Sequence, residues 1–370
     1  MSLHVQRYEE KHIPLIKAFN KRLREKGSIN QFAESHIPDW LPPREDSPLR
    51  KEYYIFGDDD VVRGGYVLKF QDFFLHGCTL RIANLQSPIS EGIIDHRFTL
   101  VGPQIVRHAL NEHPLMYSLG MGGYAEPITK FFRALCWNLI TVPFYFKVVN
   151  ARNFLTRNAY LRNSPASRLA LDIGGYSGIG SLSIHMLQYV RKRRLATAHL
   201  TTAEIGTGDE DIDKIWETVK EHYAFIAVRD SKTIDILYPP TQTRFRRMKI
   251  FSHGNCIGWV VTLCTQMSAH KQFGSLRVGS IIDCLSHPDD ASRVINCAAA
   301  SLEAEKADII VANHSHFAWG RAFEKNAFLR GPSNYIFGSS IALTQMMDQY
   351  DSVAKEIFFM RGDGDGPINL

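Results

Sequence analysis

Hydrophobic and polar positions along the chain predict a first block of helices and strands. Apolar residues recur every three or four positions in residues 11–26, 103–112 and 128–136, which predicts helices. Runs rich in β-branched and aromatic residues predict strands over residues 53–57, 61–70, 78–86, 115–119 and 142–149. The acidic stretch Asp58-Asp-Asp60 predicts a turn between the first two strands.

A second block repeats this order further along the chain. Helical spacing returns in residues 212–223, 291–306 and 317–325. Strand patterns cover residues 246–251, 256–266, 276–285, 308–312 and 334–339. The two blocks together predict an α/β fold with mixed sheets.

Three short matches relate the two blocks. Arg63-Gly-Gly-Tyr-Val-Leu68 corresponds to Cys256-Ile-Gly-Trp-Val-Val261, an offset of 193. Thr79-Leu-Arg-Ile-Ala-Asn84 corresponds to Ser275-Leu-Arg-Val-Gly-Ser280, an offset of 196. Residues 131–146 correspond to residues 322–337, an offset of 191. Strand sequences resemble one another by chance, but the common order favours two copies of one unit.

The repeat divides the chain into four parts. We expect an N-terminal domain over 1–150, a basic helical linker over 151–208, a C-terminal domain over 209–345 and a tail over 346–370. The tail contains Arg361-Gly-Asp-Gly-Asp-Gly-Pro367 and is predicted to be flexible.

Charge and composition exclude several classes of protein. The net charge is only +5, and the basic clusters at 191–194 and 244–249 are short, so we expect no nucleic-acid partner. The six cysteines form no CxxC or CxxH pair, which argues against a disulfide framework and against a zinc site. The chain starts without an apolar signal region, and its most apolar stretch, 132–149, is interrupted by Arg133 and Lys147. We therefore expect a cytoplasmic protein with no integral membrane segment and no bound metal.

The order of elements resembles the GNAT acyl-CoA N-acyltransferase fold, present twice and joined by the helical linker. The resemblance covers roughly 50–150 and 210–340. Tandem copies also resemble FemAB-like aminoacyl transferases and two-domain GNAT proteins of bacterial polysaccharide biosynthesis, the latter through the linker and the stretch from Trp216 to Arg229-Asp230. This resemblance implies transfer of an acyl group from acetyl-CoA, or another acyl-CoA, to an amine on a small polar acceptor such as an amino sugar or amino acid.

The family binds the pyrophosphate of coenzyme A with an Arg/Gln-x-x-Gly-x-Gly/Ala loop before a helix, where backbone N–H groups and close approach favour an anion. The first copy offers Arg97-Phe98-Thr99-Leu100-Val101-Gly102 as its cofactor-binding residues. Leu100 replaces the first glycine, and an ordinary loop is the alternative. The second copy has no glycine here and carries Asp289 and Asp290, which would repel a pyrophosphate. We therefore expect the cofactor in the first copy.

Acyl transfer to an amine needs a base to remove a proton and an acid for the departing thiolate. The loop after the fourth strand supplies Glu91, with Asp95 and His96 as alternatives, and Tyr117 and Tyr124 flank the fifth strand. We predict Glu91, Tyr117 and Tyr124 as catalytic residues. The alternative for each of them is an ordinary loop or packing role.

The second copy offers polar groups where two strands of this fold separate. We predict a substrate-binding role for Asp283, His287, Asn313, His314, His316 and Trp319. Asp283 lies among apolar neighbours and is expensive to bury unless it is paired. The alternative is a helix N-cap at Asn313 or Ser315, with exposed histidines.

Two competing functions remain open. Residues 169–180 resemble the first motif of S-adenosylmethionine methyltransferases, with Asp172, three glycines and Glu204 as the ribose-binding acid. Residues 172–208 have no room for the several βα units that such a sheet needs, so we interpret 165–195 as helical. The degraded pyrophosphate loop also fits a non-catalytic binding scaffold. The oligomeric state is not indicated.

Overall fold

A computed structural model describes residues 4–34, 47–58, 60–191, 199–347 and 353–364. The chain divides into two compact units, each assembled from separate segments. Unit 1 comprises Met1–Ile140 and Ile336–Tyr350, and unit 2 comprises Thr141–Tyr335 and Asp351–Leu370. The predicted boundary near residue 150 thus lies at residue 140, and the C-terminal residues are shared between the units.

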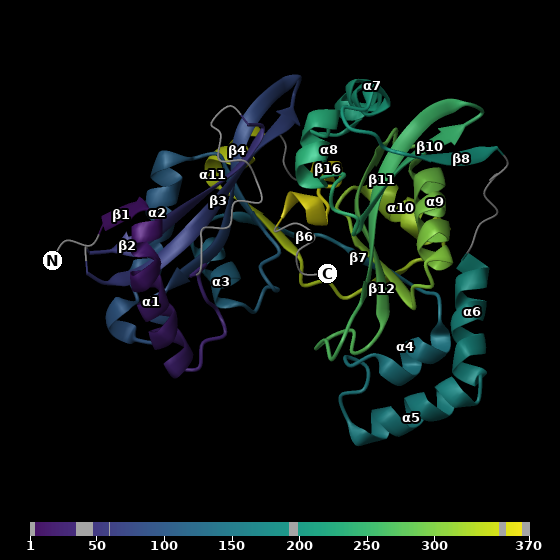
Figure 1. The fold of residues 1–370 in the computed structure, drawn as a ribbon, viewed down its shortest axis with the longest axis horizontal. Helices are drawn as coiled ribbons and strands as arrows, with labels where there is room; N and C mark the ends of the chain where they lie inside the picture. Colours follow the sequence, from purple (N-terminus) through teal and green to yellow (C-terminus); the bar gives the residue numbers. More distant parts are fainter. Residues whose placement is uncertain (1–3, 35–46, 59, 192–198, 348–352, 365–370) are drawn as a thin grey trace. The chain divides into compact units, whose positions relative to one another are not determined.

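Unit 1 is built on a mixed sheet (Figure 1). In order across the sheet its strands are β1 (His4–Arg7), β2 (Leu49–Gly57), β3 (Val62–Leu75), β4 (Cys78–Ser90), β5 (Met116–Leu119), β15 (Ile336–Ser339) and β6 (Asn138–Thr141). Its helices are α1 (Ile13–Glu25), α2 (Val101–Glu112), α3 (Pro127–Ala134) and α11 (Ile341–Met346). Strands β1 to β4 are antiparallel neighbours, whereas β4 and β5 run parallel.

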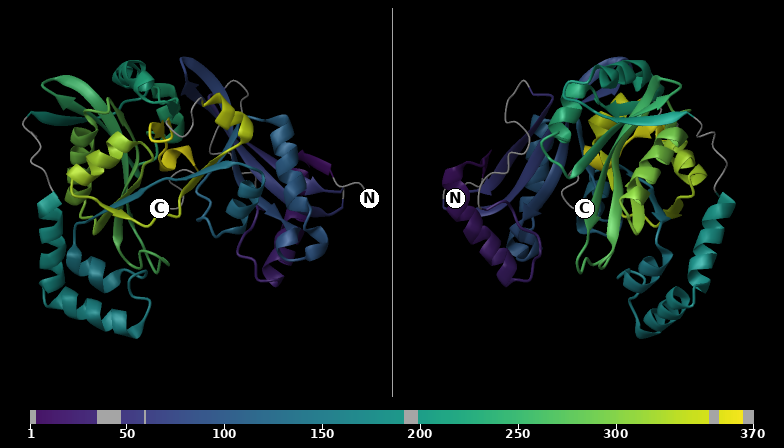
Figure 2. Two further views of the ribbon diagram at one scale, coloured as in Figure 1. Left: turned by 180° about the vertical axis from the view of Figure 1, so that it is seen from behind. Right: turned by 45° about the vertical axis from the view of Figure 1, so that its right-hand side comes forward.

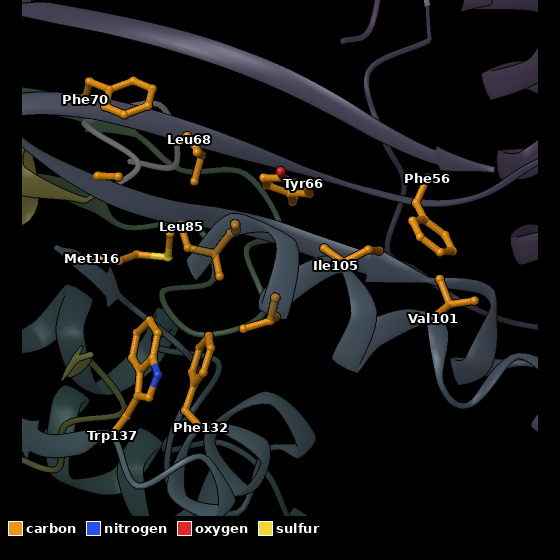
Figure 3. Packing of buried hydrophobic residues seen from close by; sticks show 13 residues of the cluster. Phe56, Tyr66, Leu68, Phe70, Leu85, Val101, Ile105, Met116, Phe132 and Trp137 are labelled. Carbon is orange, nitrogen blue, oxygen red and sulfur yellow. The ribbon is translucent and has the colours of Figure 1, made fainter. Parts of the chain in front are cut away.

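Alternate residues of β3 and β4 point to opposite faces of this sheet. Tyr66, Leu68 and Leu85 pack with α2 and α3 in one core, which Figure 3 shows from close by. Val67 points to the other face and packs with α1 through Phe19. The period-2 pattern of the strands and the 3–4 pattern of the helices therefore place the layers as the sequence predicts.

Unit 2 has a second mixed sheet (Figure 1). In order its strands are β14 (Leu329–Gly331), β7 (Phe144–Val148), β13 (Ile309–Asn313), β12 (Arg277–Ser286), β11 (Asn255–Gln266), β10 (Phe245–Ser252) and β8 (Leu200–Glu204). Its helices are α4 (Ala151–Arg157), α5 (Pro165–Tyr176), α6 (Ile179–Arg191), α7 (Glu210–Val219), α8 (Ser231–Leu237), α9 (Ala291–Ala304) and α10 (Phe317–Lys325). A further short strand, β16 (Ile357–Phe358), pairs in parallel with β9 (Phe225–Ala227).

The two units exchange one strand. Strand β7 follows the helices of unit 1 in sequence but pairs with β13 in unit 2. Strand β15 follows the helices of unit 2 but pairs with β5 in unit 1. The repeat relates these strands to each other at its offset of 191. Each unit is thus completed by a strand from the other half of the chain.

The positions of two glycines in the structure show that the sequence alignment of 63–68 with 256–261 is shifted by one residue. Gly64 pairs with Ser90 at the end of β4, and Gly258 pairs with Ser286 at the end of β12. A Cβ on Gly64 would lie 2.7 Å from a side-chain atom of Ile105 in α2, and one on Gly258 would lie 2.9 Å from Val294 in α9. The equivalent residues are therefore Gly64 and Gly258, an offset of 194. The sequence match was shifted by one residue, and such a shift exchanges the two faces of a strand.

The linker is helical in part, as predicted. Helices α4, α5 and α6 lie beside one another, as Figure 2 shows in teal. The helical interpretation of 165–195 holds for the described residues, since 165–176 form α5 and 179–191 form α6. Residues 200–204 depart from the prediction, since they form β8 and pair with β10.

Candidate functional site

In unit 1 the parallel strands β4 and β5 separate soon after they meet. Their register contains two residue pairs, Ala83 with Met116 and Asn84 with Tyr117. Beyond these, the Ser118 hydroxyl donates to the Leu85 carbonyl at 3.0 Å. The chain then leaves β4 through two short 3₁₀ turns, η2 (Glu91–Ile93) and η3 (His96–Phe98), and enters α2. This stretch is the one that the sequence predicts for the cofactor.

Glu91 is buried and held by two arginines. Arg22 of α1 donates to Glu91 Oε1 from Nε at 2.7 Å, and Arg63 of β3 donates to Oε2 from Nη1 at 2.8 Å. The Arg63 guanidinium also lies 4.2 Å from the centre of the Phe98 ring. Accepting a proton would break both ion pairs, so the geometry favours an anchoring role for Glu91. Its role as general base stays a prediction.

The residues predicted for pyrophosphate binding lie at the exposed start of α2. Arg97 is exposed and paired with Asp95, whose pKa it lowers to about 2 through side-chain hydrogen bonds. Leu100 is the N-cap residue, and no side chain caps the helix there. A Cβ on Gly102 would meet only Ser90, at 3.4 Å, an ordinary contact distance. The first helical N–H groups have no intrahelical partner, so an anion can be bound here.

The two tyrosines near β5 differ in environment. Tyr117 is fully buried within β5, with its ring 5.4 Å from that of Phe73. Tyr124 is partly exposed, and its hydroxyl lies 3.4 Å from the Leu139 carbonyl oxygen. The proton-donor role expected for both stays a prediction.

In unit 2 the strands β12 and β13 also separate, and a segment near the C-terminus of the chain lies in the space between them. Pairing of β12 with β13 ends at Ile281 and Ala312. Residues 357–363, here called the C-terminal segment, lie against both strands beyond that point. On the β13 side, the Ser315 backbone donates to the Phe359 carbonyl at 3.1 Å, and the Phe359 backbone donates to the Ser315 hydroxyl at 2.7 Å. On the β12 side, Cys284 Sγ lies 3.4 Å from Met360 Sδ.

A buried arginine secures this segment. Arg229 donates from Nε to Asp283 of β12 at 2.9 Å and from Nη2 to both carboxylate oxygens of Asp363 at 2.9 and 2.8 Å. All three side chains are about 1% exposed. Burial alone would lower the pKa of Arg229, but the two carboxylates hold that pKa above its ordinary value. Burial raises the pKa of Asp283, against the opposing effect of Arg229.

The predicted substrate-binding histidines lie at the same place and are buried. His314 stacks on Trp319 with ring centres 5.2 Å apart and meets Phe358 edge-on at 4.5 Å. His316 accepts from the Ala318 backbone through Nδ1 and so caps α10. Burial lowers the pKa of His314, and it lowers the pKa of His316 to about 4. A helix does begin here, but its N-cap is His316 and not Asn313 or Ser315, and both histidines are buried rather than exposed.

The remaining predicted residues of unit 2 separate into two groups. Asn313 is buried at the end of β13, and its side-chain nitrogen donates to the Pro143 carbonyl at 3.3 Å. His287 lies after β12 in contact with the ring of His222, at 4.3 Å between centres. Asp289 is exposed, and Asp290 is the N-cap residue of α9. Thus Asp283, His314 and Trp319 gather around the C-terminal segment, whereas His287 lies outside this cluster.

The glycines and the aspartate that resemble a methyltransferase motif serve the packing of helices in unit 2. Asp172 is paired with Arg162 at 2.6 Å within the helices of unit 2. A Cβ on Gly175 would lie 3.0 Å from Thr156 of α4, and one on Gly180 would lie 2.7 Å from Leu155. These glycines therefore permit close packing of α5 and α6 on α4. Glu204 is exposed on strand β8.

Several residues of the cluster around the C-terminal segment were not predicted from the sequence. Asp363 belongs to the tail that was predicted to be flexible, yet it is buried. Tyr238 donates to Asp283 at 2.9 Å, and Tyr223 accepts from Trp319 Nε1 at 2.9 Å. In the sequence, Asp283 alone pointed to this cluster, because an acid among apolar neighbours needs a buried partner.

Within the described ranges, no group of three or more His, Cys, Asp or Glu side chains could hold a metal ion. None of the helices that the structure describes is long and apolar enough to span a bilayer.

No protein-family model and no curated protein sequence matches the chain. Among solved structures, a GCN5-related N-acetyltransferase from Anabaena variabilis aligns with 91% of this chain and 72% of its own, at a TM-score of 0.50 and 8% identity. N-myristoyltransferase of Saccharomyces cerevisiae with bound myristoyl-CoA aligns with 91% of this chain and 82% of its own, at 0.49 and 7%. A probable N-acyltransferase from Enterococcus faecalis covers 91% and 72%, at 0.48 and 11% identity. The chain has a mixed α/β fold of the GNAT-like acyltransferase type.

Proposed function

We propose that the protein is an N-acyltransferase that uses an acyl-CoA in unit 1. The observation that supports this proposal is the difference between the two units. In unit 2 the separation of β12 and β13 is occupied by the C-terminal segment, and the carboxylate of Asp290 at the N-cap position of α9 would repel a pyrophosphate. In unit 1 the equivalent helix α2 starts at an exposed, uncapped N-terminus, which suits the pyrophosphate of a cofactor.

In the proposed reaction, a neutral amine attacks the thioester carbonyl carbon, the C–S bond breaks, and coenzyme A leaves as a thiol once its sulfur gains a proton. The chain supplies Arg97 and the backbone from Phe98 to Gly102 for the cofactor. Tyr117 and Tyr124 are the candidates to protonate the sulfur, and Glu91 is retained as the candidate base. No protein nucleophile is required, because the donor carries its own leaving group.

We propose that the two copies of the fold have different functions, with the acyl-CoA bound in unit 1 only. The substrate-binding role predicted in unit 2 for Asp283, His287, Asn313, His314, His316 and Trp319 stays a prediction. We further propose acetyl-CoA as the donor and an amino sugar or amino acid as the acceptor, in cytoplasmic polysaccharide biosynthesis. These finer assignments rest on the order of elements and on the duplicated unit.

A thermal-shift assay tests this proposal. Acetyl-CoA at 100 times its dissociation constant should stabilise the fold by about 2.7 kcal/mol, with longer acyl-CoA esters tested in parallel. S-adenosylmethionine should produce no shift, since Asp172 is engaged by Arg162. Stabilisation by S-adenosylmethionine alone would favour the methyltransferase, and no shift with any acyl-CoA would favour a binding scaffold.

A further inference from the structure

The helices α5 and α6 form a hairpin whose outer side is apolar. Large apolar residues recur at helical spacing and are each 60% to 70% exposed: Leu169, Ile173, Tyr176, Ile179, Leu182 and Met186. We call these six residues the apolar stripe. In the described part of the chain, half of the large hydrophobic side chains that are exposed lie between Tyr160 and Met186. A concentration of this kind marks an interaction surface.

The stripe lies on the side of the hairpin that is not used for packing within unit 2. Gly175 and Gly180 face α4 and approach Thr156 and Leu155. Leu155 of α4 is buried. The packing of the hairpin on unit 2 is therefore complete without the stripe.

The same stretch carries a net positive charge. Residues 151–191 contain five Arg and one Asp, a net charge of +4, whereas the whole chain carries +5, so the rest carries only +1. The one acid, Asp172, is already paired with Arg162. The guanidinium of Arg152 lies 5.0 Å from the ring of Tyr176, which belongs to the stripe. Basic and apolar groups are thus combined on one surface.

A surface that is both apolar and basic favours one class of partner over others. A second copy of the hairpin would bring together two helical regions of like net charge, +4 each over residues 151–191, which Coulomb repulsion opposes. A nucleic acid would satisfy the charge but leave the aliphatic side chains of the stripe without an apolar environment. A bilayer containing anionic lipids satisfies both, since apolar residues enter the interface while basic residues meet the headgroups.

We propose that the α5–α6 hairpin docks the protein on the surface of an anionic lipid bilayer. The helices lie in the plane of the interface, because each is too short to span a hydrocarbon core of about 30 Å. Helix α5 has 12 residues and α6 has 13. The inference stands on unit 2 alone and does not depend on the proposed acyl transfer.

Vesicle flotation with the full chain tests this proposal. The protein should float with vesicles of phosphatidylcholine mixed with phosphatidylglycerol and should float much less with phosphatidylcholine alone. Binding should weaken as salt rises, because screening shortens the range of electrostatic attraction from about 10 Å at 0.1 M to about 3 Å at 1 M. The variant Leu169→Ser/Ile173→Ser/Leu182→Ser should lose at least about tenfold in vesicle affinity, since three apolar side chains no longer enter the interface.

A matched variant controls for loss of surface hydrophobicity in general. Ile29→Ser/Ile93→Ser removes two exposed side chains outside the hairpin and should bind vesicles like the unchanged protein. Because all five positions are exposed, both variants should keep the melting temperature of the parent. Absence of flotation, equal flotation with neutral vesicles, or full binding by the triple variant would each overturn the proposal. So would a dimer in solution that the triple variant converts to monomer, because the stripe would then be a self-association surface.

Discussion

Arg229 and Asp363 are 134 positions apart in the chain, yet two hydrogen bonds of 2.9 and 2.8 Å join them inside unit 2. The same guanidinium reaches Asp283 and lies 4.5 Å from the centre of the Phe358 ring. The end of the chain is therefore part of the core of unit 2. This arrangement occupies the space between β12 and β13 beyond the point where their pairing ends.

Removing the arginine should strongly destabilise unit 2. In Arg229→Met, Asp283 and Asp363 would be left buried without their cation, and breaking a buried ion pair costs about 3–5 kcal/mol. The loss is measured as the change in the free energy of unfolding in urea. Arg97→Ala, which breaks an exposed pair with Asp95, is the control and should change this free energy little. Unchanged stability of Arg229→Met would mean that the C-terminal segment is not held in this way.

Acid should destabilise the fold through the buried histidines. The folded-state pKa of His316 is about 4, and that of His314 is also lowered, both because of burial. Between pH 6.5 and pH 4 the unfolded chain binds protons that the folded chain does not, so the free energy of unfolding falls as the pH falls. For His316 alone the loss at pH 4 is about 3 kcal/mol.

The contribution of His316 can be isolated with His316→Asn. Asparagine can still cap α10 by accepting from the Ala318 backbone, but it does not titrate. Urea unfolding at both ends of the pH window should show a smaller acid loss for the variant than for the parent. An equal loss in both proteins would show that His316 is not the group responsible.

The two equivalent glycines should be equally intolerant of a side chain. A Cβ on Gly64 would lie 2.7 Å from the Ile89 carbonyl oxygen, and one on Gly258 would lie 2.6 Å from the Leu285 carbonyl oxygen. We expect Gly64→Ala and Gly258→Ala each to lower the free energy of unfolding by about 1–3 kcal/mol. Gly102→Ala has room and should cause no loss. If either strand variant were as stable as the parent, the equivalence of the two positions would lose its basis.

The proposed cofactor site predicts an asymmetric effect on binding. Gly102→Leu adds bulk at the start of α2 where only Ser90 is near, so the fold should tolerate it while the pyrophosphate loses close contact. Affinity for acetyl-CoA, measured by calorimetry, should fall at least about tenfold, or about 1.4 kcal/mol. Asp289→Ala, in the exposed loop just before α9 of unit 2, should leave affinity unchanged. If Gly102→Leu binds acetyl-CoA with the affinity of the parent, the cofactor does not bind at α2.

Local patterns in the sequence predict most of the elements and the fold class. The helix at residues 317–325 coincides with α10, and the strand at 256–266 differs from β11 by one residue. These elements follow from side-chain periodicity, which is a local property. The similarity of the two halves also appears in the sequence, although one match was displaced by a residue.

The exchange of strands and the buried ion pairs could not be predicted in the same way. Nothing in the sequence of β7 or β15 distinguishes pairing within one half from pairing across halves, because hydrogen-bonded pairing is non-local. Asp363 lies in a glycine-rich stretch that is typical of flexible tails, and its burial depends on Arg229 far away in sequence. The glycines of 174–180 resembled a nucleotide-binding turn, because close helix packing and close ligand approach both favour glycine.

Calorimetric titration of the full chain with acetyl-CoA tests the division of labour between the two units most directly. If acetyl-CoA itself gives no heat or is too weak, the longer acyl-CoA that stabilises the fold takes its place. One molecule should bind per chain, since no acid stands at the N-terminus of α2, whereas unit 2 has Asp290 at the start of α9 and the C-terminal segment between β12 and β13. Two bound molecules per chain would contradict the assignment of a single site to unit 1. No binding of any acyl-CoA would contradict the proposed acyl transfer itself.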